Sequence, residues 1–393
     1  MNIRWTILVA ALLLAAGCAT KTQTQQEAAT AQWNTARATV LMSLAKDQFE
    51  SGNFDKARQT VDEAIKLNPK NAGSLTLSAR IYIERGQLEN ALKQLDSARE
   101  ADPRLAEADY FTGVIFQRWQ QSEKALEFYQ SAMTKAEKDP APVLATAETL
   151  VQLKRLDEAL TLLVDKSDQF QNSAVLLDAR GQLLVQAGRP RDAIEVLRRA
   201  AMLDTEEAGI REHLAMALFA AGEWREAASS IDRLLKLDAY KNRSDLFAAL
   251  GLCQLQLGNA RESRKTFEQA TQMNPNSPRI WLGLAKACLH AGENKRAEIA
   301  AKKALALDPL LAEAHIVIGF GYLRETQFDY ALSSFKKASA IDPLDTVSLC
   351  MIGYVFEQKG DHDQALKYYT QALKLKPNDV LAKELLAGTM EQQ

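Results

Sequence analysis

The sequence predicts an all-α solenoid, a row of helix pairs in which each pair packs against its neighbours along the chain. Three observations predict this fold class. The 393-residue chain is similar to itself at a spacing of 34 residues, small residues recur at fixed places in that period, and only 18 Gly and 10 Pro interrupt it. A fixed period of this length indicates a repeat architecture, and the scarcity of Gly and Pro favours helices.

The repeats are clearest when two distant stretches are aligned. The stretch NAGSLTLSARIYIERGQLENALKQLDSAREADPR begins at Asn71, and it aligns with PRIWLGLAKACLHAGENKRAEIAAKKALALDPL, which begins at Pro278. Ten repeats follow from this alignment: 38–71, 72–105, 106–139, 140–173, 174–207, 208–241, 244–277, 278–311, 312–345 and 346–379. The two extra residues, Asn242 and Arg243, predict a bend between six repeats (38–241) and four (244–379).

Three positions of the repeat have a physical explanation. The eighth position is Gly or Ala in every repeat, because the two helices of a repeat cross closely there. The fifteenth is usually Gly, the residue that most easily ends a helix with a positive φ. The twentieth is Ala in nine of ten repeats, where the second helix meets the first.

This combination resembles the tetratricopeptide repeat over residues 38–379. The resemblance implies a right-handed superhelix of about ten helix-turn-helix repeats. It also implies a concave face lined by the first helix of each repeat, mainly at positions 2, 5, 6, 9, 12 and 13. Residues 380–393 are expected to form one short helix that covers the last apolar face, as the end of a solenoid requires.

The N-terminus has the pattern of an export signal. Residues 1–17 contain a basic residue, Arg4, followed by a short apolar run and then small residues, as in a secretory signal peptide. The string LLLAAGC, which ends at Cys18, resembles the bacterial lipobox, although Ala15 stands where Leu is usual. The resemblance implies cleavage before Cys18 and acyl chains such as palmitate on that residue. Because Ala19 is not Asp, the resemblance further implies that the protein is anchored in the outer membrane and faces the periplasm. The alternative is an ordinary signal peptide.

The segment between Cys18 and the first repeat is rich in Gln, Thr and Ala and poor in large apolar residues. Residues 18–37 are therefore expected to comprise the lipidated Cys18, a flexible tether after it and a short lead-in helix. Residues 28–37 are expected to be helical already, with Trp33 packed against the first repeat.

No catalytic motif is recognisable. The four His lie in different repeats, and the chain contains no HExxH, paired CxxC, phosphate loop or GxSxG. The near balance of 48 basic and 50 acidic residues argues against a nucleic-acid binder. We therefore expect no enzyme activity, no metal, no small-molecule substrate and no cofactor other than the covalent lipid. Cys253, Cys288 and Cys350 are interpreted as small buried hydrophobes, with a Cys253–Cys288 disulfide left open.

The concave positions named above predict the partner-binding residues. They are Arg80, Tyr110, Phe111, Val114, Leu282, Lys286, Ile316, Phe320, Arg324, Met351 and Tyr354. An apolar stripe in an accessible groove indicates a protein partner, bound as a peptide or an amphipathic helix. Two alternatives stay open. Some of these side chains, Leu289 and Leu323 first of all, could belong to the core between repeats, or the C-terminal helix or another protomer could cover them.

The sequence thus leads us to expect a lipid-anchored scaffold or adaptor that assembles or stabilises a complex of the bacterial envelope. It resembles tetratricopeptide lipoproteins that serve secretins and pili, export systems or cell-wall machinery. A structural periplasmic component of an exopolysaccharide export system is the alternative.

Overall fold

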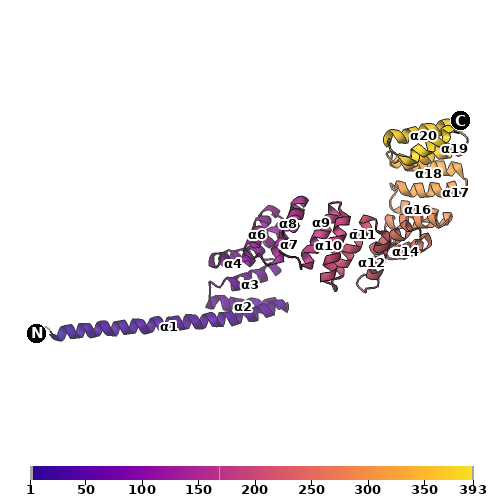
Figure 1. Ribbon diagram of the computed structural model, residues 1–393. Coiled ribbons are helices and arrows are strands. Elements are labelled where there is room, and N and C mark those ends of the chain that lie inside the picture. The colour runs from indigo at the N-terminus through magenta and orange to yellow at the C-terminus, as the bar shows by residue number, and fades with distance from the viewer. Residues whose placement is uncertain (1–2, 168, 392–393) are drawn as a thin grey trace. The chain divides into compact units, whose positions relative to one another are not determined.

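The computed structural model describes the backbone of residues 3–167 and 169–391, with side chains from Gln26 onward except Glu27. Over these residues the chain forms 21 helices and no strand (Figure 1). The predicted all-α repeat fold is therefore confirmed.

The helices alternate between first and second helices of the repeats. The first helices are α1 (Ile3–Glu50), α3 (Ala72–Glu84), α5 (Ala106–Arg118), α7 (Pro140–Gln152), α9 (Ala174–Gln186), α11 (Ala208–Ala221), α13 (Ser244–Gln256), α15 (Pro278–His290), α17 (Ala312–Arg324) and α19 (Thr346–Gln358). The second helices are α2 (Phe54–Leu67), α4 (Leu88–Ala101), α6 (Ser122–Lys135), α8 (Leu156–Asp165), α10 (Pro190–Leu203), α12 (Trp224–Leu235), α14 (Ala260–Met273), α16 (Asn294–Leu307), α18 (Phe328–Ile341) and α20 (His362–Leu375). A final helix, α21 (Val380–Glu391), follows the last pair.

The chain divides into two compact units, Met1–Leu183 and Leu184–Gln393, called unit 1 and unit 2 below. The division falls inside α9. The two extra residues, Asn242 and Arg243, lie between α12 and α13. At that place Arg243 binds Glu212 of α11 and Asp245 of α13, in each case with an N···O distance of 2.7 Å. The extra residues therefore tie two neighbouring repeats together.

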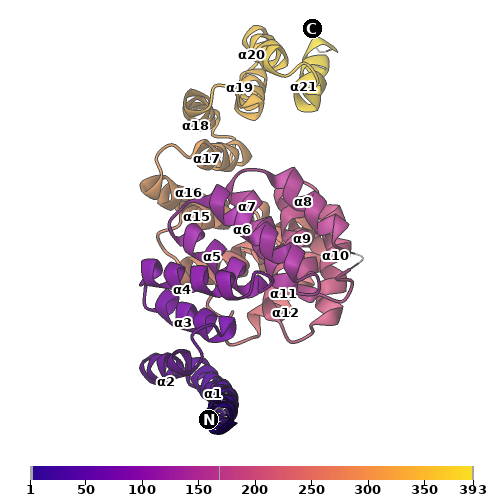
Figure 2. The ribbon, with the colours of Figure 1, turned by 90° about the vertical axis from the view of Figure 1, so that its left-hand side faces the viewer.

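Within each unit, consecutive helices pack against one another (Figure 2). In four repeats, position 8 of the first helix approaches the side chain at position 24 of the second closely. A Cβ added to Gly113 would lie 2.6 Å from the ring of Tyr129, and one added to Gly319 would lie 2.6 Å from the ring of Phe335. Glycine at position 8 therefore makes room for an aromatic ring.

The remaining repeats follow the same size rule, with one exception. Gly251 and Gly353 likewise face the rings of Phe267 and Tyr369. Where position 8 is Ala, position 24 is aliphatic, and the pairs are Ala45 with Val61, Ala79 with Leu95, Ala147 with Leu163, Ala215 with Ile231 and Ala285 with Ala301. Gly181, whose position-24 partner is Leu197, departs from the rule. The two positions together fill one volume, as a close-packed core requires.

The turn after each first helix has the same backbone conformation in all ten repeats. Position 15 has a positive φ of 70–81° at seven glycines, and also at Gln120 (59°), Lys154 (61°) and Thr326 (57°). The recurring glycine thus marks a position where the backbone is left-handed. Three repeats hold a non-glycine residue in this conformation, at an energetic cost.

Helix α1 is longer than the sequence predicts. It runs through residues 19–37, of which only 28–37 were expected to be helical. No Pro, and no Gly before Gly52, interrupts the sequence after Cys18, so nothing in it breaks the helix. The signal peptide, Cys18 and the first part of the tether lie within residues 1–25, outside the side chains that the structure describes.

Trp33 does not pack on the first repeat, contrary to expectation. Its side chain is 68% exposed, whereas Ala38 and Ala45 on the same helix are fully buried. Helix α2 has 14 residues and folds back along α1 from the turn at 51–53, so it reaches only about as far as residue 37. Trp33 lies beyond its end.

The C-terminal cap forms as predicted. Helix α21 packs against α19 and α20, and Ala382 and Leu385 join the core cluster that contains Met351 and Phe335. In the described chain the three cysteines are free and buried, and burial raises the pKa of Cys253 and Cys288 to about 11 and that of Cys350 to about 12. They are inert small hydrophobes, as expected.

Candidate partner-binding groove

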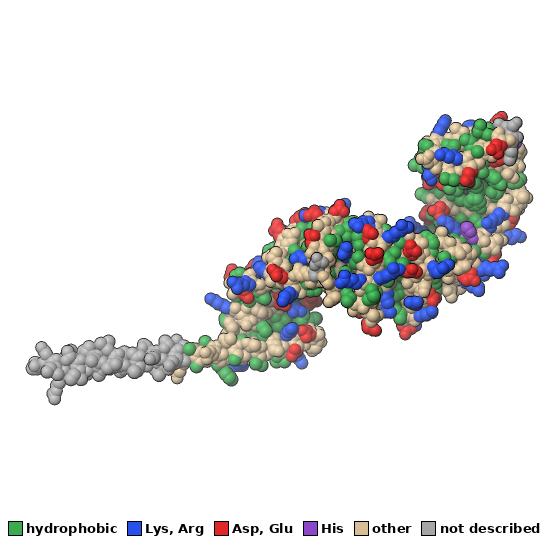
Figure 3. Space-filling model, in the orientation of Figure 1, with side chains coloured by type: hydrophobic (Ala, Val, Ile, Leu, Met, Phe, Trp, Pro, Cys, Tyr) green, Lys and Arg blue, Asp and Glu red, His purple; other side chains and the backbone are tan. Residues whose placement is uncertain are grey.

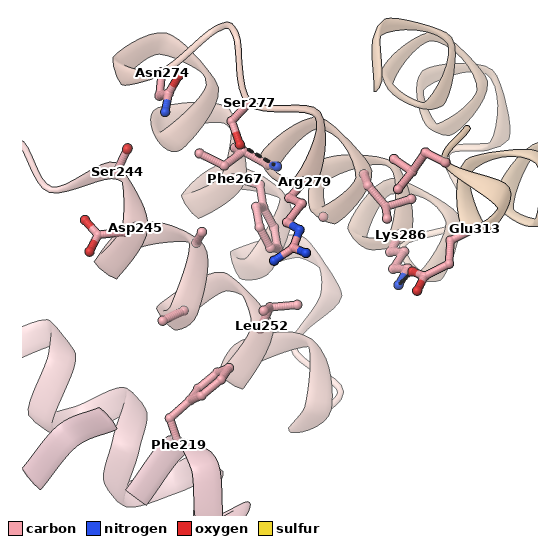
Figure 4. A pocket seen from close by; sticks show the side chains of 16 residues that line it. Phe219, Ser244, Asp245, Leu252, Phe267, Asn274, Ser277, Arg279, Lys286 and Glu313 are labelled. Carbon is pink, nitrogen blue, oxygen red and sulfur yellow. Dashed lines mark hydrogen bonds and ion pairs between the residues drawn. The ribbon is translucent and has the colours of Figure 1, made fainter. Parts of the chain in front are cut away.

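A pocket of about 590 Å³ lies on the first helices of unit 2 (Figure 4). Its lining residues come from α11, α13, α15 and α17, together with Phe267 of α14 and residues of the turns that precede α15 and α17, namely Asn274, Ser277 and Leu311. Four successive first helices therefore contribute to one hollow, on the face that the repeat pattern assigns to binding.

The floor of the pocket is apolar. Phe219 of α11, Leu252 of α13 and Leu282 of α15 line it together with Ala248 and Ala249. The hollow exists because small residues occupy positions 5 and 6 of α13, where larger side chains would fill the space.

Gly283 also shapes the floor. It lies at position 6 of α15, and any Cβ there would collide with the ring of Phe267, which enters from the preceding repeat. Glycine at this place therefore lets a buried ring from one repeat support the pocket floor in the next.

The rim of the pocket is charged. Lys286 of α15 forms an ion pair with Glu313 of α17. Asp245 accepts hydrogen bonds from Arg243 at 2.9 and 2.7 Å, and these bonds lower the pKa of the Asp245 carboxyl. Among the described residues, the exposed guanidinium of Arg279 has no hydrogen-bond or ion-pair partner.

Two of the predicted partner-binding residues, Leu282 and Lys286, line this pocket. Ile316, Phe320 and Tyr354 are half-buried and pack against the core cluster of α18 to α21. Figure 3 shows hydrophobic side chains gathered in the region of α17 and α18. The apolar stripe predicted for these repeats is thus partly core and partly surface.

Met351 and Arg324 are less available than the sequence suggested. Met351 is only 7% exposed and belongs to the core that α21 helps to cover. Arg324 donates a hydrogen bond to the carbonyl oxygen of Leu289, at the end of the preceding first helix. Arg118, at the same repeat position in unit 1, donates to Ile83 in the same way at 2.7 Å. This position links successive repeats. Leu289 is 6% exposed and lies in the core, as the sequence analysis left open.

The predicted residues of unit 1 form an aromatic cluster beside Arg80. The guanidinium of Arg80 lies 4.7 Å from the ring centroid of Phe49 and 5.1 Å from that of Phe111. Tyr110 packs edge-on against Phe111, with centroids 5.3 Å apart, and also contacts Tyr129. Val114 is half-buried against the neighbouring core. These side chains fill the concave face largely by contacting one another.

Sequence reasoning missed most of the pocket. Phe219, Asp245, Leu252 and Arg279 occupy positions 12, 2, 9 and 2 of their repeats, which are among the concave positions already identified. Applying those positions to repeat 7 (244–277) would have found two of them. The hollow itself depends on which neighbouring side chains are small.

The described residues contain no group of three or more His, Cys, Asp or Glu side chains arranged to hold a metal ion. Within the same part of the chain, no helix has both the length and the hydropathy needed to cross a bilayer.

Solved structures with similar helical arrangements include the crystal structure of the APC/C hetero-tetramer Cut9-Hcn1. It shares 13% sequence identity with a TM-score of 0.47, over 90% of this chain and 96% of that one. Two crystal structures of MamA each share 23% identity with a TM-score of 0.38. They cover 42% and 44% of this chain and 95% and 93% of their own. No curated protein sequence matches the chain.

Family models match much of the sequence, and none of those that match describes an enzyme. The model for the C-terminal domain of cilia and flagella-associated protein 70 matches residues 233–393. One tetratricopeptide repeat model matches residues 27–112 and another matches residues 143–309. Together with the alternating helix pairs, these matches show tetratricopeptide repeats over residues 27–112 and 143–309.

Proposed function

We propose that this protein is a non-catalytic scaffold that binds a segment of a protein partner in the concave groove of unit 2. The observation that carries the proposal is the pocket of about 590 Å³ formed by four successive first helices. A hollow of this size, with an apolar floor and a few polar groups at its rim, is the usual form of a binding site. The half-exposed Ile316, Phe320 and Tyr354 extend the apolar surface and suit a peptide or an amphipathic helix.

The proposal includes a lipid anchor. The string LLLAAGC supports lipidation of Cys18, and Ala19 supports an outer-membrane position facing the periplasm. Several acyl chains hold a protein far more firmly than one does. In that setting the scaffold assembles or stabilises an envelope complex, such as a secretin or pilus, an export system or cell-wall machinery. The covalent lipid is the single attached group in this proposal, and the partner is a protein rather than a nucleic acid or small molecule.

The groove assignment is tested by site-specific photo-crosslinking in intact cells. A benzophenone side chain at Leu252, on the pocket floor, is expected to capture one partner protein. The matched control is Leu257, which lies at the end of the same helix, is 36% exposed and does not line the pocket. Capture of the same proteins at both positions would contradict the groove assignment.

A second variant separates binding from folding. Leu252→Gln is expected to weaken partner capture while the thermal unfolding midpoint changes little, because Leu252 is only partly buried. Leu257→Gln is expected to leave both unchanged.

The anchor is tested independently of the groove. The variant Cys18→Ser is expected to move the protein from the membrane fraction to the periplasmic fraction, and metabolic labelling with a palmitate analogue is expected to be lost. Membrane retention in this variant would rule out the lipid anchor and leave the groove proposal intact.

A further inference from the structure

The pocket rim leaves one charge unbalanced. Four charged side chains line the pocket, namely Asp245, Arg279, Lys286 and Glu313. Lys286 is paired with Glu313, and Asp245 is paired with Arg243. Of the four, Arg279 is the one that makes no hydrogen bond or ion pair with any described residue.

We propose that the partner segment presents an Asp or Glu side chain to Arg279, next to an apolar side chain that enters the pocket. This inference rests on the proposed function and specifies the chemistry of the partner. Arg279 follows Pro278 in the first turn of α15, and Figure 4 shows its side chain reaching toward the centre of the pocket from that helix.

The apolar floor determines which group of the partner must face Arg279. An occupant that fills the pocket over Leu252 and Leu282 also removes water from the guanidinium of Arg279, which lines the same pocket. A charged group that loses water without gaining a partner is costly. A carboxylate restores the lost hydrogen bonds in the paired geometry that guanidinium groups favour, whereas a Lys or Arg at that place would be repelled.

The extent of the pocket indicates a chain segment rather than a chain end. An occupant that contacts both Phe219 of α11 and Glu313 of α17 has to pass over α13 and α15. A continuous internal segment does this, and its carboxylate is then a side chain. Lys286 is already paired with Glu313, so Arg279 is the one unpaired cation among the described lining residues. No second cation is therefore free to bind a terminal carboxylate.

The experiment is a selection of phage-displayed random peptides on the full chain, with the peptides fused at their C-terminal ends so that no free terminus is present. Peptides that depend on the pocket are identified by their loss on the Leu252→Gln variant. Among them we expect enrichment of Asp or Glu close to Leu, Ile or Phe. The same selection on Arg279→Glu is expected to replace the acidic residues by Lys or Arg.

Binding affinities make the test quantitative. For one selected acidic peptide, Arg279→Gln is expected to raise Kd by about three- to tenfold, and substitution of the peptide carboxylate by its amide to have the same effect. The matched control is Arg261→Gln, since Arg261 is an exposed arginine of α14 that does not line the pocket. It is expected to leave Kd unchanged.

The outcomes distinguish the two proposals. Pocket-dependent peptides without acidic residues, bound equally well by Arg279→Glu, would overturn this inference and leave the scaffold function standing. Acidic enrichment only in a parallel library with free C-termini would also overturn it. An absence of any peptide that depends on Leu252 would instead count against the proposed function.

Discussion

Repeat 3 of unit 1 and repeat 7 of unit 2 use the same two concave positions in opposite ways. At positions 5 and 6, repeat 3 of unit 1 has Tyr110 and Phe111, which pack edge-on against each other, and the ring of Phe111 also contacts the guanidinium of Arg80. Unit 2 has Ala248 and Ala249 at those positions, and there the structure contains a pocket. In these two repeats, aromatic side chains at positions 5 and 6 fill the concave face, whereas two Ala residues leave room for a pocket.

The largest expected effect concerns what the two units share. Gly113→Ala in unit 1 and Gly319→Ala in unit 2 both place a Cβ 2.6 Å from a buried ring. Each variant is expected to lose about 2–3 kcal/mol of stability, because the ring cannot move away in a packed core. Chemical denaturation of each variant measures this loss.

A second-site change supplies the control for these glycines. Phe335→Leu is expected to restore part of the stability of Gly319→Ala, since Ala79 and Leu95 form a native pair of that kind. Gly388→Ala, where a Cβ would meet nothing within 4 Å, is expected to be neutral or slightly stabilising. If Gly388→Ala destabilised as much as the others, helix packing at position 8 would not be the cause.

The second prediction concerns the difference between the faces. Phe111→Ala is expected to lose about 2 kcal/mol of stability, because the ring contacts Arg80, Tyr110 and the core of unit 1. Phe219→Ala, on the open pocket, is expected to lose less stability and to impair partner binding. If both variants lost the same stability and neither impaired partner binding, the difference between a filled face in unit 1 and an open pocket in unit 2 would be contradicted.

A smaller and opposite effect is expected at the turns. Thr326→Gly in unit 2 and Lys154→Gly in unit 1 relieve a non-glycine residue at a φ of about 60°. Each is expected to raise stability by about 1 kcal/mol, and Thr326 somewhat more because it is β-branched. Gly292→Ala, at the equivalent turn of another repeat, is the reverse control and is expected to lower the unfolding midpoint.

The smallest effect is a difference in pH dependence. Burial raises the pKa of Glu148 beside the unit 1 cluster, so its contribution to stability is full below its ordinary pKa and is lost as pH rises through the raised value. Hydrogen bonds from Arg243 lower the pKa of Asp245 in unit 2, so its contribution is present above its ordinary pKa and is lost as pH falls through the lowered value.

Acidification should therefore act in opposite directions at the two carboxyls. The stability of the wild-type protein, compared with that of the Glu148→Gln variant, is expected to rise as pH falls toward the ordinary pKa of Glu148. Relative to Asp245→Asn, the wild-type protein is expected to lose stability as pH falls below the ordinary pKa of Asp245. Thermal unfolding across the acidic range compares them, and slopes of the same sign would contradict the assignment.

How far the sequence predicts the structure depends on the range of the interaction. The ten helix pairs, the left-handed turns and the C-terminal helix follow from local patterns, and the structure confirms them. Trp33 was misplaced because its burial depends on how far α2 reaches along α1. The sequence did not predict the hydrogen bond from Arg243 to Glu212, because the two residues lie 31 positions apart.

The candidate site shows the same limit. The sequence by itself determined the 34-residue repeat, and the resemblance to the tetratricopeptide repeat implied which positions line the concave face, Leu282 and Lys286 among them. It could not show that Met351 is covered by the core around α21 or that Arg324 is engaged by the carbonyl of Leu289. The tertiary structure decided those points, because a pocket is the volume that several helices leave unfilled. That volume depends on the sizes and partners of side chains from different repeats, whereas a repeat pattern records only the position of each residue on its own helix.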